Sequence, residues 1–148
     1  MKTIKQIKTT IVLAIIFILL AFTIALDKLH NRDFQINISE AKKPKTTYDE
    51  MKFKDGKVWC GDQAAEKMQL KWMRYEIVKD STYKDEDIDV EYLEILATTK
   101  LGKDELFEMK CVIDNYQIEG TMRLLKAEKE KKAWSFTGKE KVKPEKKK

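Results

Sequence analysis

The sequence predicts an α+β protein: one N-terminal transmembrane helix, then one amphipathic helix packed on a roughly four-stranded antiparallel meander. Three observations predict it. Residues 11–26 form an apolar run. Apolar residues then recur at spacings of three and four over 62–79, as on one helix face. Between 90 and 138, segments rich in β-branched and aromatic residues are joined by short polar connectors, as in a meander.

The N-terminus predicts targeting to a membrane. Residues 1–10 form a basic segment. The apolar run 11–26 would span about 24 Å as a helix, or about 27 Å with Thr9 and Thr10, which is close to the bilayer hydrocarbon thickness. An uncleaved anchor and a cleaved secretory signal share this layout, and both readings stay open. The positive charge before the run favours a cytoplasmic N-terminus at the cell (inner) membrane. In either reading the rest of the chain is exported to a periplasmic or extracellular location.

The exported part begins with a predicted stalk over residues 27–48, which lack clear periodicity. The α+β domain is predicted over 49–138. At its start, Asp55-Gly56 lies between two short alternating runs, which favours a small hairpin. Residues 139–148 contain six lysines and two glutamates and predict a disordered, solvated tail.

The helix is predicted over residues 62–79, with Asp62 as a plausible N-cap. Its apolar stripe consists of Ala65, Met68, Trp72 and Tyr75. Four strands are expected after it, at 90–99, 105–114, 119–127 and 133–138.

The two cysteines predict a disulfide between Cys60 and Cys111. Cys60 directly precedes the predicted helix, and Cys111 lies on the core face of the strand 105–114. An exported domain with a small core can keep a disulfide. By closing the loop between the two cysteines, this disulfide would stabilise the folded state by about 4 kcal/mol. The alternative is two unrelated buried thiols.

The segment "LLKAEKEKKAWSFTG" joins a charged hairpin to a tryptophan strand. Together with the order of elements over residues 62–140, it resembles membrane-anchored cystatin-like and nuclear-transport-factor-like extracytoplasmic domains. The resemblance implies a helix laid over a curved sheet. It also implies an architecture like that of the periplasmic scaffolds of type IV secretion systems. It assigns no functional residues to this sequence.

Motifs for catalysis or metal binding are missing from the sequence. His30 is the only histidine and lies in the predicted stalk, so no catalytic residues, metal or cofactor are predicted. The acidic segment 85–91 lacks the glycine and the glutamate of a calcium loop. The net charge of +5 is concentrated at the two ends of the chain, which argues against a nucleic-acid partner.

These features favour a non-enzymatic, single-pass membrane protein whose exported domain mediates protein–protein interaction, as an accessory or scaffold subunit of an envelope complex. A first alternative is an apolar small-molecule module with a groove between helix and sheet, lined by Met68, Trp72, Met109 and Trp134. A second is a small cone-fold hydrolase or isomerase, which requires a buried carboxylate.

Overall fold

The computed structural model describes residues 28–43, 45–61 and 69–141. In this part of the chain, eight antiparallel strands follow one another in sequence order, and the last pairs with the first to close a barrel. The strands are β1 (Arg32–Glu40), β2 (Thr46–Lys54), β3 (Lys57–Trp59), β4 (Met73–Asp85), β5 (Ile88–Lys100), β6 (Glu105–Asp114), β7 (Gln117–Lys126) and β8 (Lys129–Glu140).

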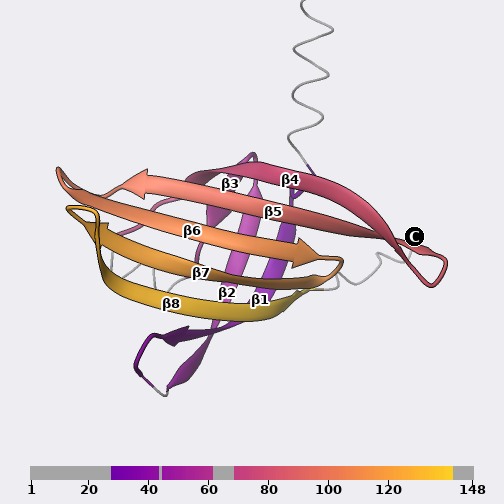
Figure 1. Ribbon diagram of the computed structural model, residues 1–148, viewed down its shortest axis with the longest axis horizontal. Helices are drawn as coiled ribbons and strands as arrows, with labels where there is room; N and C mark the ends of the chain where they lie inside the picture. Colours follow the sequence, from indigo (N-terminus) through magenta and orange to yellow (C-terminus); the bar gives the residue numbers. More distant parts are fainter. Residues whose placement is uncertain (1–27, 44, 62–68, 142–148) are drawn as a thin grey trace, which may run out of the picture.

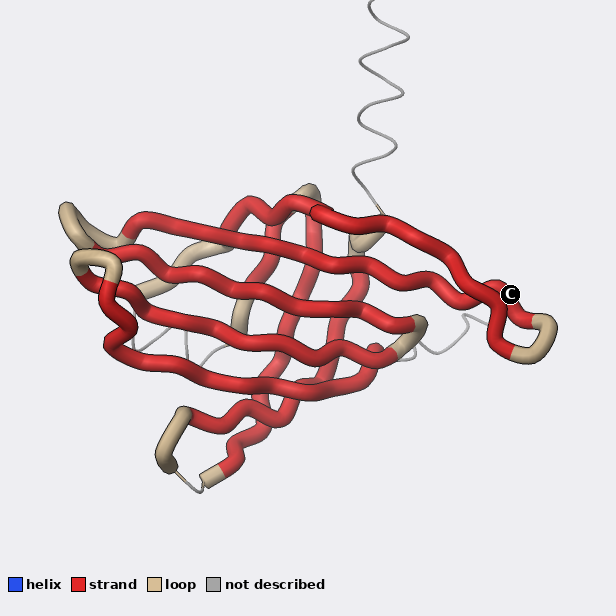
Figure 2. The backbone as a smooth tube through the Cα atoms, in the orientation of Figure 1, coloured by secondary structure: helices blue, strands red, loops and turns tan. Residues whose placement is uncertain are grey.

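The barrel has two unlike walls. Strands β5 to β8 are long and lie side by side across the front of the molecule, whereas β1, β2 and β3 cross behind them at a steep angle (Figure 1). The same path drawn as a tube shows tight turns joining successive long strands (Figure 2). β3 is the weakest element, because it has three residues, three register positions with β2 and two with β4.

The core follows from the alternation of side chains along each strand. Phe107, Met109, Cys111 and Ile113 of β6 point inward, with polar or half-buried residues between them. An eight-stranded barrel has an interior just wide enough for side chains to fill or for one small ligand. Here the inward side chains of all eight strands join in one apolar cluster, which includes the fully buried rings of Phe34, Phe53 and Phe107.

One end of the barrel is held by an arginine. Arg32, at the start of β1, donates hydrogen bonds to Glu91 of β5 (2.8 Å), to Glu140 of β8 (2.7 Å) and to the carbonyl of Asn115 (2.7 Å). Its side chain is only 15% exposed. Hydrogen bonds to charged groups are among the stronger side-chain interactions, so Arg32 links the first strand to the wall that closes the barrel.

The predicted α+β class is wrong, because the described part of the chain is all-β and contains no helix. Of the predicted helix 62–79, residues 62–68 lie outside the described residues, and residues 73–79 belong to β4. There the buried positions Met73 and Tyr75 alternate with exposed ones. This two-residue period competes with the helical spacing, and pairing with β5 over ten register positions decides in favour of a strand.

The predicted stalk is also corrected. Residues 32–40 form β1, whose buried Phe34, Ile36 and Ile38 face the core, and residues 46–48 begin β2. The folded domain therefore starts nearer the N-terminus than expected, and the helix-on-sheet plan implied by the cystatin-like resemblance does not hold. The Asp55-Gly56 hairpin is confirmed as the β2–β3 turn, where both residues have positive φ.

The predicted membrane segment 11–26 and most of the lysine-rich tail lie outside the described residues. Within the described ranges, no helix is long and apolar enough to cross a membrane.

Candidate functional site

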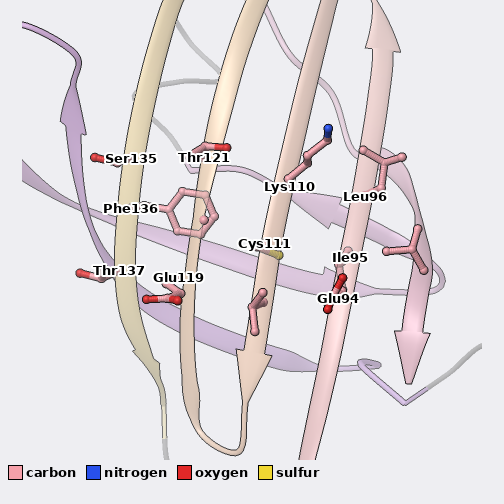
Figure 3. A pocket seen from close by; sticks show the side chains of 13 residues that line it. Glu94, Ile95, Leu96, Lys110, Cys111, Glu119, Thr121, Ser135, Phe136 and Thr137 are labelled. Atoms are coloured by element: carbon pink, nitrogen blue, oxygen red, sulfur yellow. The ribbon is translucent and has the colours of Figure 1, made fainter. Parts of the chain in front are cut away.

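The candidate site is an open hollow on the outer surface of β4 to β8, which we call the outer trough. It has a volume of about 630 Å³. Its outward-pointing lining residues are Val78, Glu94, Leu96, Lys110, Val112, Glu119, Thr121, Ser135 and Thr137. Figure 3 shows these side chains spread over neighbouring strands, from Ser135 and Thr137 on one side to Glu94 and Leu96 on the other.

The registers arrange the lining in two rows that cross the sheet. In one row, Leu96, Lys110, Thr121 and Ser135 are successive partners on β5, β6, β7 and β8. In the second row, Glu94, Val112, Glu119 and Thr137 are the successive partners. Because side chains at paired positions lie on the same face, each row forms a continuous strip of outer surface.

A bulge adds an apolar residue at the edge of the trough. The β4–β5 register shifts between Ile77 and Lys79, and Val78 lies at the shift. Val78 is 56% exposed, whereas Leu96 and Val112 are half-buried. A bulge re-aims side chains and disrupts pairing locally. Here it leaves an aliphatic side chain at the margin of a surface whose middle is also partly aliphatic.

Charges surround the aliphatic part of the trough. The Lys79 ammonium lies 3.3 Å from the Glu94 carboxylate, and Lys110 lies 3.5 Å from Glu108. Glu119 is exposed and has no ion-pair partner among the described residues. The outer trough therefore combines an aliphatic floor with a mixed rim that includes the exposed Glu119 carboxylate.

The packing of the core beneath the trough depends on Gly120. This residue faces the interior of the barrel and is paired in register with Cys111 and Phe136. A Cβ atom at this position would lie 2.3 Å from the Lys110 carbonyl oxygen and 2.7 Å from Phe136 Cζ. Only a residue without a side chain lets the Phe136 ring pack this closely under β7. Sequence reasoning placed residues 119–127 in a strand but did not identify this requirement.

The predicted disulfide is wrong, because Cys60 and Cys111 are free, buried thiols. Cys60 Sγ lies 3.3 Å from Met109 Sδ in the core. Burial raises the pKa of the Cys60 thiol, and the nearby Cys111 raises it further. Burial also raises the pKa of Cys111 to about 12. Since the thiolate is the nucleophilic form, neither cysteine presents a reactive group to the trough.

The residues of the predicted apolar groove do not line one surface. Met109 and Trp134 are buried in the barrel core, and Trp72 lies outside the core with its side chain 41% exposed. Trp72 packs against Trp59, with ring centroids 6.0 Å apart. Met68 lies outside the described residues.

The described residues supply few groups for chemistry. No charged or polar side chain is fully buried among them, so the carboxylate that a cone-fold hydrolase requires is not found in this part of the chain. The described ranges also contain no group of three or more potential metal ligands. His30 lies 3.2 Å from Asp55 at the β2–β3 turn, apart from the hydroxyl groups of the trough.

No family model, curated protein or solved structure matches this chain at a significant level.

Proposed function

We propose that the protein is an exported, non-enzymatic binding module that acts as an accessory or scaffold subunit of an envelope complex. The outer trough is the docking site for its protein partner. One observation carries the proposal: an aliphatic floor crosses several neighbouring strands and is bordered by charged and hydroxyl side chains. Protein interfaces commonly have this anatomy, with an apolar centre and a polar rim. The export is inferred from the basic and apolar N-terminal segments.

The chemistry of the trough defines what the partner presents. Val78, Leu96 and Val112 suit aliphatic side chains, and the exposed Glu119 suits a lysine or arginine at the edge of the contact. The strands under the trough are paired on both sides, so the partner contacts side chains and does not add a strand there.

The test is site-specific photo-crosslinking in the native cell. A crosslinking amino acid at Val112 is expected to yield one defined protein adduct, and the same group at exposed Lys131 on β8 is expected to yield none. The captured partner is then purified, and Val112→Asp is expected to weaken its binding about tenfold or more, since this substitution places a charge in the apolar centre. Equal adducts from both positions, or unchanged binding by Val112→Asp, would contradict the proposal.

A further inference from the structure

A row of like charges crosses the opposite wall of the barrel. Lys54 of β2 is paired in register with Lys57 of β3, and Lys57 is paired with Arg74 of β4. All three side chains are exposed, and none has a carboxylate partner among the described residues. Like charges directly opposite each other on one face destabilise a sheet. The row is therefore unfavourable for the described barrel on its own, and an anionic partner would relieve the repulsion.

Two tryptophans border this row. Trp59 is paired in register with Lys52, and its ring centroid lies 6.0 Å from that of Trp72. Trp72 is 41% exposed and follows the exposed Lys71. Tryptophan side chains are enriched where an apolar environment meets water, including the headgroup level of membranes. We call the set Lys54, Lys57, Trp59, Lys71, Trp72 and Arg74 the cationic tryptophan face.

This face adjoins the end of the barrel at which the chain enters. The Asp55 amide donates a hydrogen bond to His30 Nδ1 at 3.3 Å, and the Tyr75 amide donates one to the Gly56 carbonyl at 3.3 Å. In Figure 1 the start of β1 and the β2–β3 turn lie along the same edge of the barrel. The start of β1 thus lies beside the turn that joins Lys54 to Lys57.

The sequence places a membrane segment close to this edge. Leu29 is fully buried in the core, and the apolar run ends at residue 26. Three residues of extended chain cover at most about 10 Å. A barrel attached through this run therefore lies against the bilayer surface, within reach of the lipid headgroups. This step rests on the membrane targeting proposed above, whereas the charge and the tryptophans of the face are independent of it.

We propose that the cationic tryptophan face docks the barrel onto a surface of anionic phospholipid. Lys54, Lys57, Lys71 and Arg74 bind lipid phosphates, and Trp72 enters the headgroup layer beside Trp59. The contact orients the barrel so that the outer trough, on the far wall, faces away from the membrane toward a partner. Basic residues close to an anionic surface each strengthen such binding by about fivefold, and salt weakens the attraction.

The test uses the full chain reconstituted into vesicles of phosphatidylcholine, alone or mixed with phosphatidylglycerol, with a fluorescence quencher attached at headgroup depth. Tryptophan fluorescence is expected to be quenched in the anionic vesicles and to recover at high salt. Trp134 is buried in the core and serves as a constant background. Trp72→Ala is expected to remove most of the quenching, and Lys57→Glu combined with Arg74→Glu is expected to abolish the dependence on anionic lipid.

The matched control is Lys129→Glu combined with Lys131→Glu, which changes net charge equally at exposed positions of β8. It is expected to leave quenching unchanged. Equal loss in the control pair would overturn the proposal, because it would show a response to net charge alone. Equal quenching in vesicles with and without phosphatidylglycerol would also overturn it. The proposal would also be overturned if acidic peptide or single-stranded oligonucleotide, added at the same concentration of negative charge, displaced the cationic tryptophan face from anionic vesicles. None of these results depends on a partner for the outer trough.

Discussion

The two walls of the barrel differ in how charged residues are paired across their strands. On the long-strand wall, β5 to β8, Glu108 is paired in register with Arg123, and Glu105 with Lys126, and both pairs form ion pairs across the strands. The opposite wall, β1 to β3, continues into the start of β4, and we call it the short-strand wall. There three cations on β2, β3 and β4 occupy successive paired positions. The long-strand wall also has a like-charged pair, Lys126 with Lys129 beside the β7–β8 turn, and β2 has an ion pair between Glu50 and Lys52. What sets the second wall apart is the uninterrupted row of three cations, whose mutual repulsion opposes strand pairing.

The same contrast holds for backbone pairing. β6 and β7 share ten register positions, whereas β3 shares two with β4. The long-strand wall is therefore a rigid support for the outer trough. The short-strand wall has fewer paired backbone positions, so it can adjust more easily when its side chains bind a partner. Substitutions in each wall test whether the two walls differ in this way.

The largest effect is expected from Gly120→Ala in the long-strand wall. The added Cβ would meet the Lys110 backbone carbonyl at 2.3 Å, which cannot move without disturbing the β6–β7 pairing. We expect the free energy of unfolding to fall by about 3 kcal/mol in denaturant titrations. The control is Gly102→Ala, where the nearest heavy atom lies 4.0 Å away. Similar losses for both variants would refute the close packing of β7 on the core.

A smaller effect is expected from Glu108→Gln, which removes the cross-strand ion pair. The Arg123 guanidinium, hydrogen-bonded to Glu108, holds the pKa of that carboxyl below its ordinary value. A carboxyl with a lowered folded-state pKa contributes stability above its ordinary pKa of 4.5, and this contribution is lost as the pH falls below that value. Arg123 is 38% exposed, so we expect a loss below about 1 kcal/mol at neutral pH.

Unfolding measured between neutral pH and pH 3 checks this prediction. The stability difference between the native protein and Glu108→Gln is expected to shrink as the pH falls below 4.5. Glu119→Gln, at an exposed carboxylate without an ion-pair partner in the described chain, is the matched control. A difference that persisted unchanged at low pH would show that the effect does not come from ionisation of Glu108.

The smallest effect has the opposite sign. Lys57→Glu places a carboxylate between Lys54 and Arg74 on the short-strand wall, so two repulsive pairs become attractive. We expect the barrel to gain about 0.5 kcal/mol in thermal or denaturant unfolding. Lys131→Glu on β8 is the comparison, with no expected gain. If Lys57→Glu instead destabilised the barrel, the charge row would not be the unfavourable element that the lipid proposal requires.

Much of the long-strand wall could be predicted from the sequence. The segment 105–114 alternates cleanly and is β6 as expected, and the predicted segments 90–99, 119–127 and 133–138 overlap β5, β7 and β8. A local pattern suffices where one face of a strand is buried and the other is wet. The Asp55-Gly56 turn was equally local, because its positive φ angles follow from residue type.

The other half of the fold was missed for two different reasons. The sequence does contain the signal for β1, since Phe34, Ile36 and Ile38 alternate with polar residues. The alternation is short, and residues 27–48 as a whole lack clear periodicity, so the sequence predicts a stalk there. Around the start of β4 the sequence carries both a helical period and a two-residue period. Trp72, just before β4, fits the helical period, although its side chain lies outside the core. Neighbouring residues alone cannot decide between two periods of similar strength.

Local sequence patterns were sufficient to identify four later strands, one tight turn, and the basic and apolar N-terminal segments. The closure of the sheet through β1 and β8, and the free, buried state of Cys60 and Cys111, became clear from the tertiary structure alone. The tertiary structure also decided which residues share the outer trough and the cationic tryptophan face. Both surfaces join residues far apart in the chain, and strand register, which depends on the whole barrel, is what places them side by side.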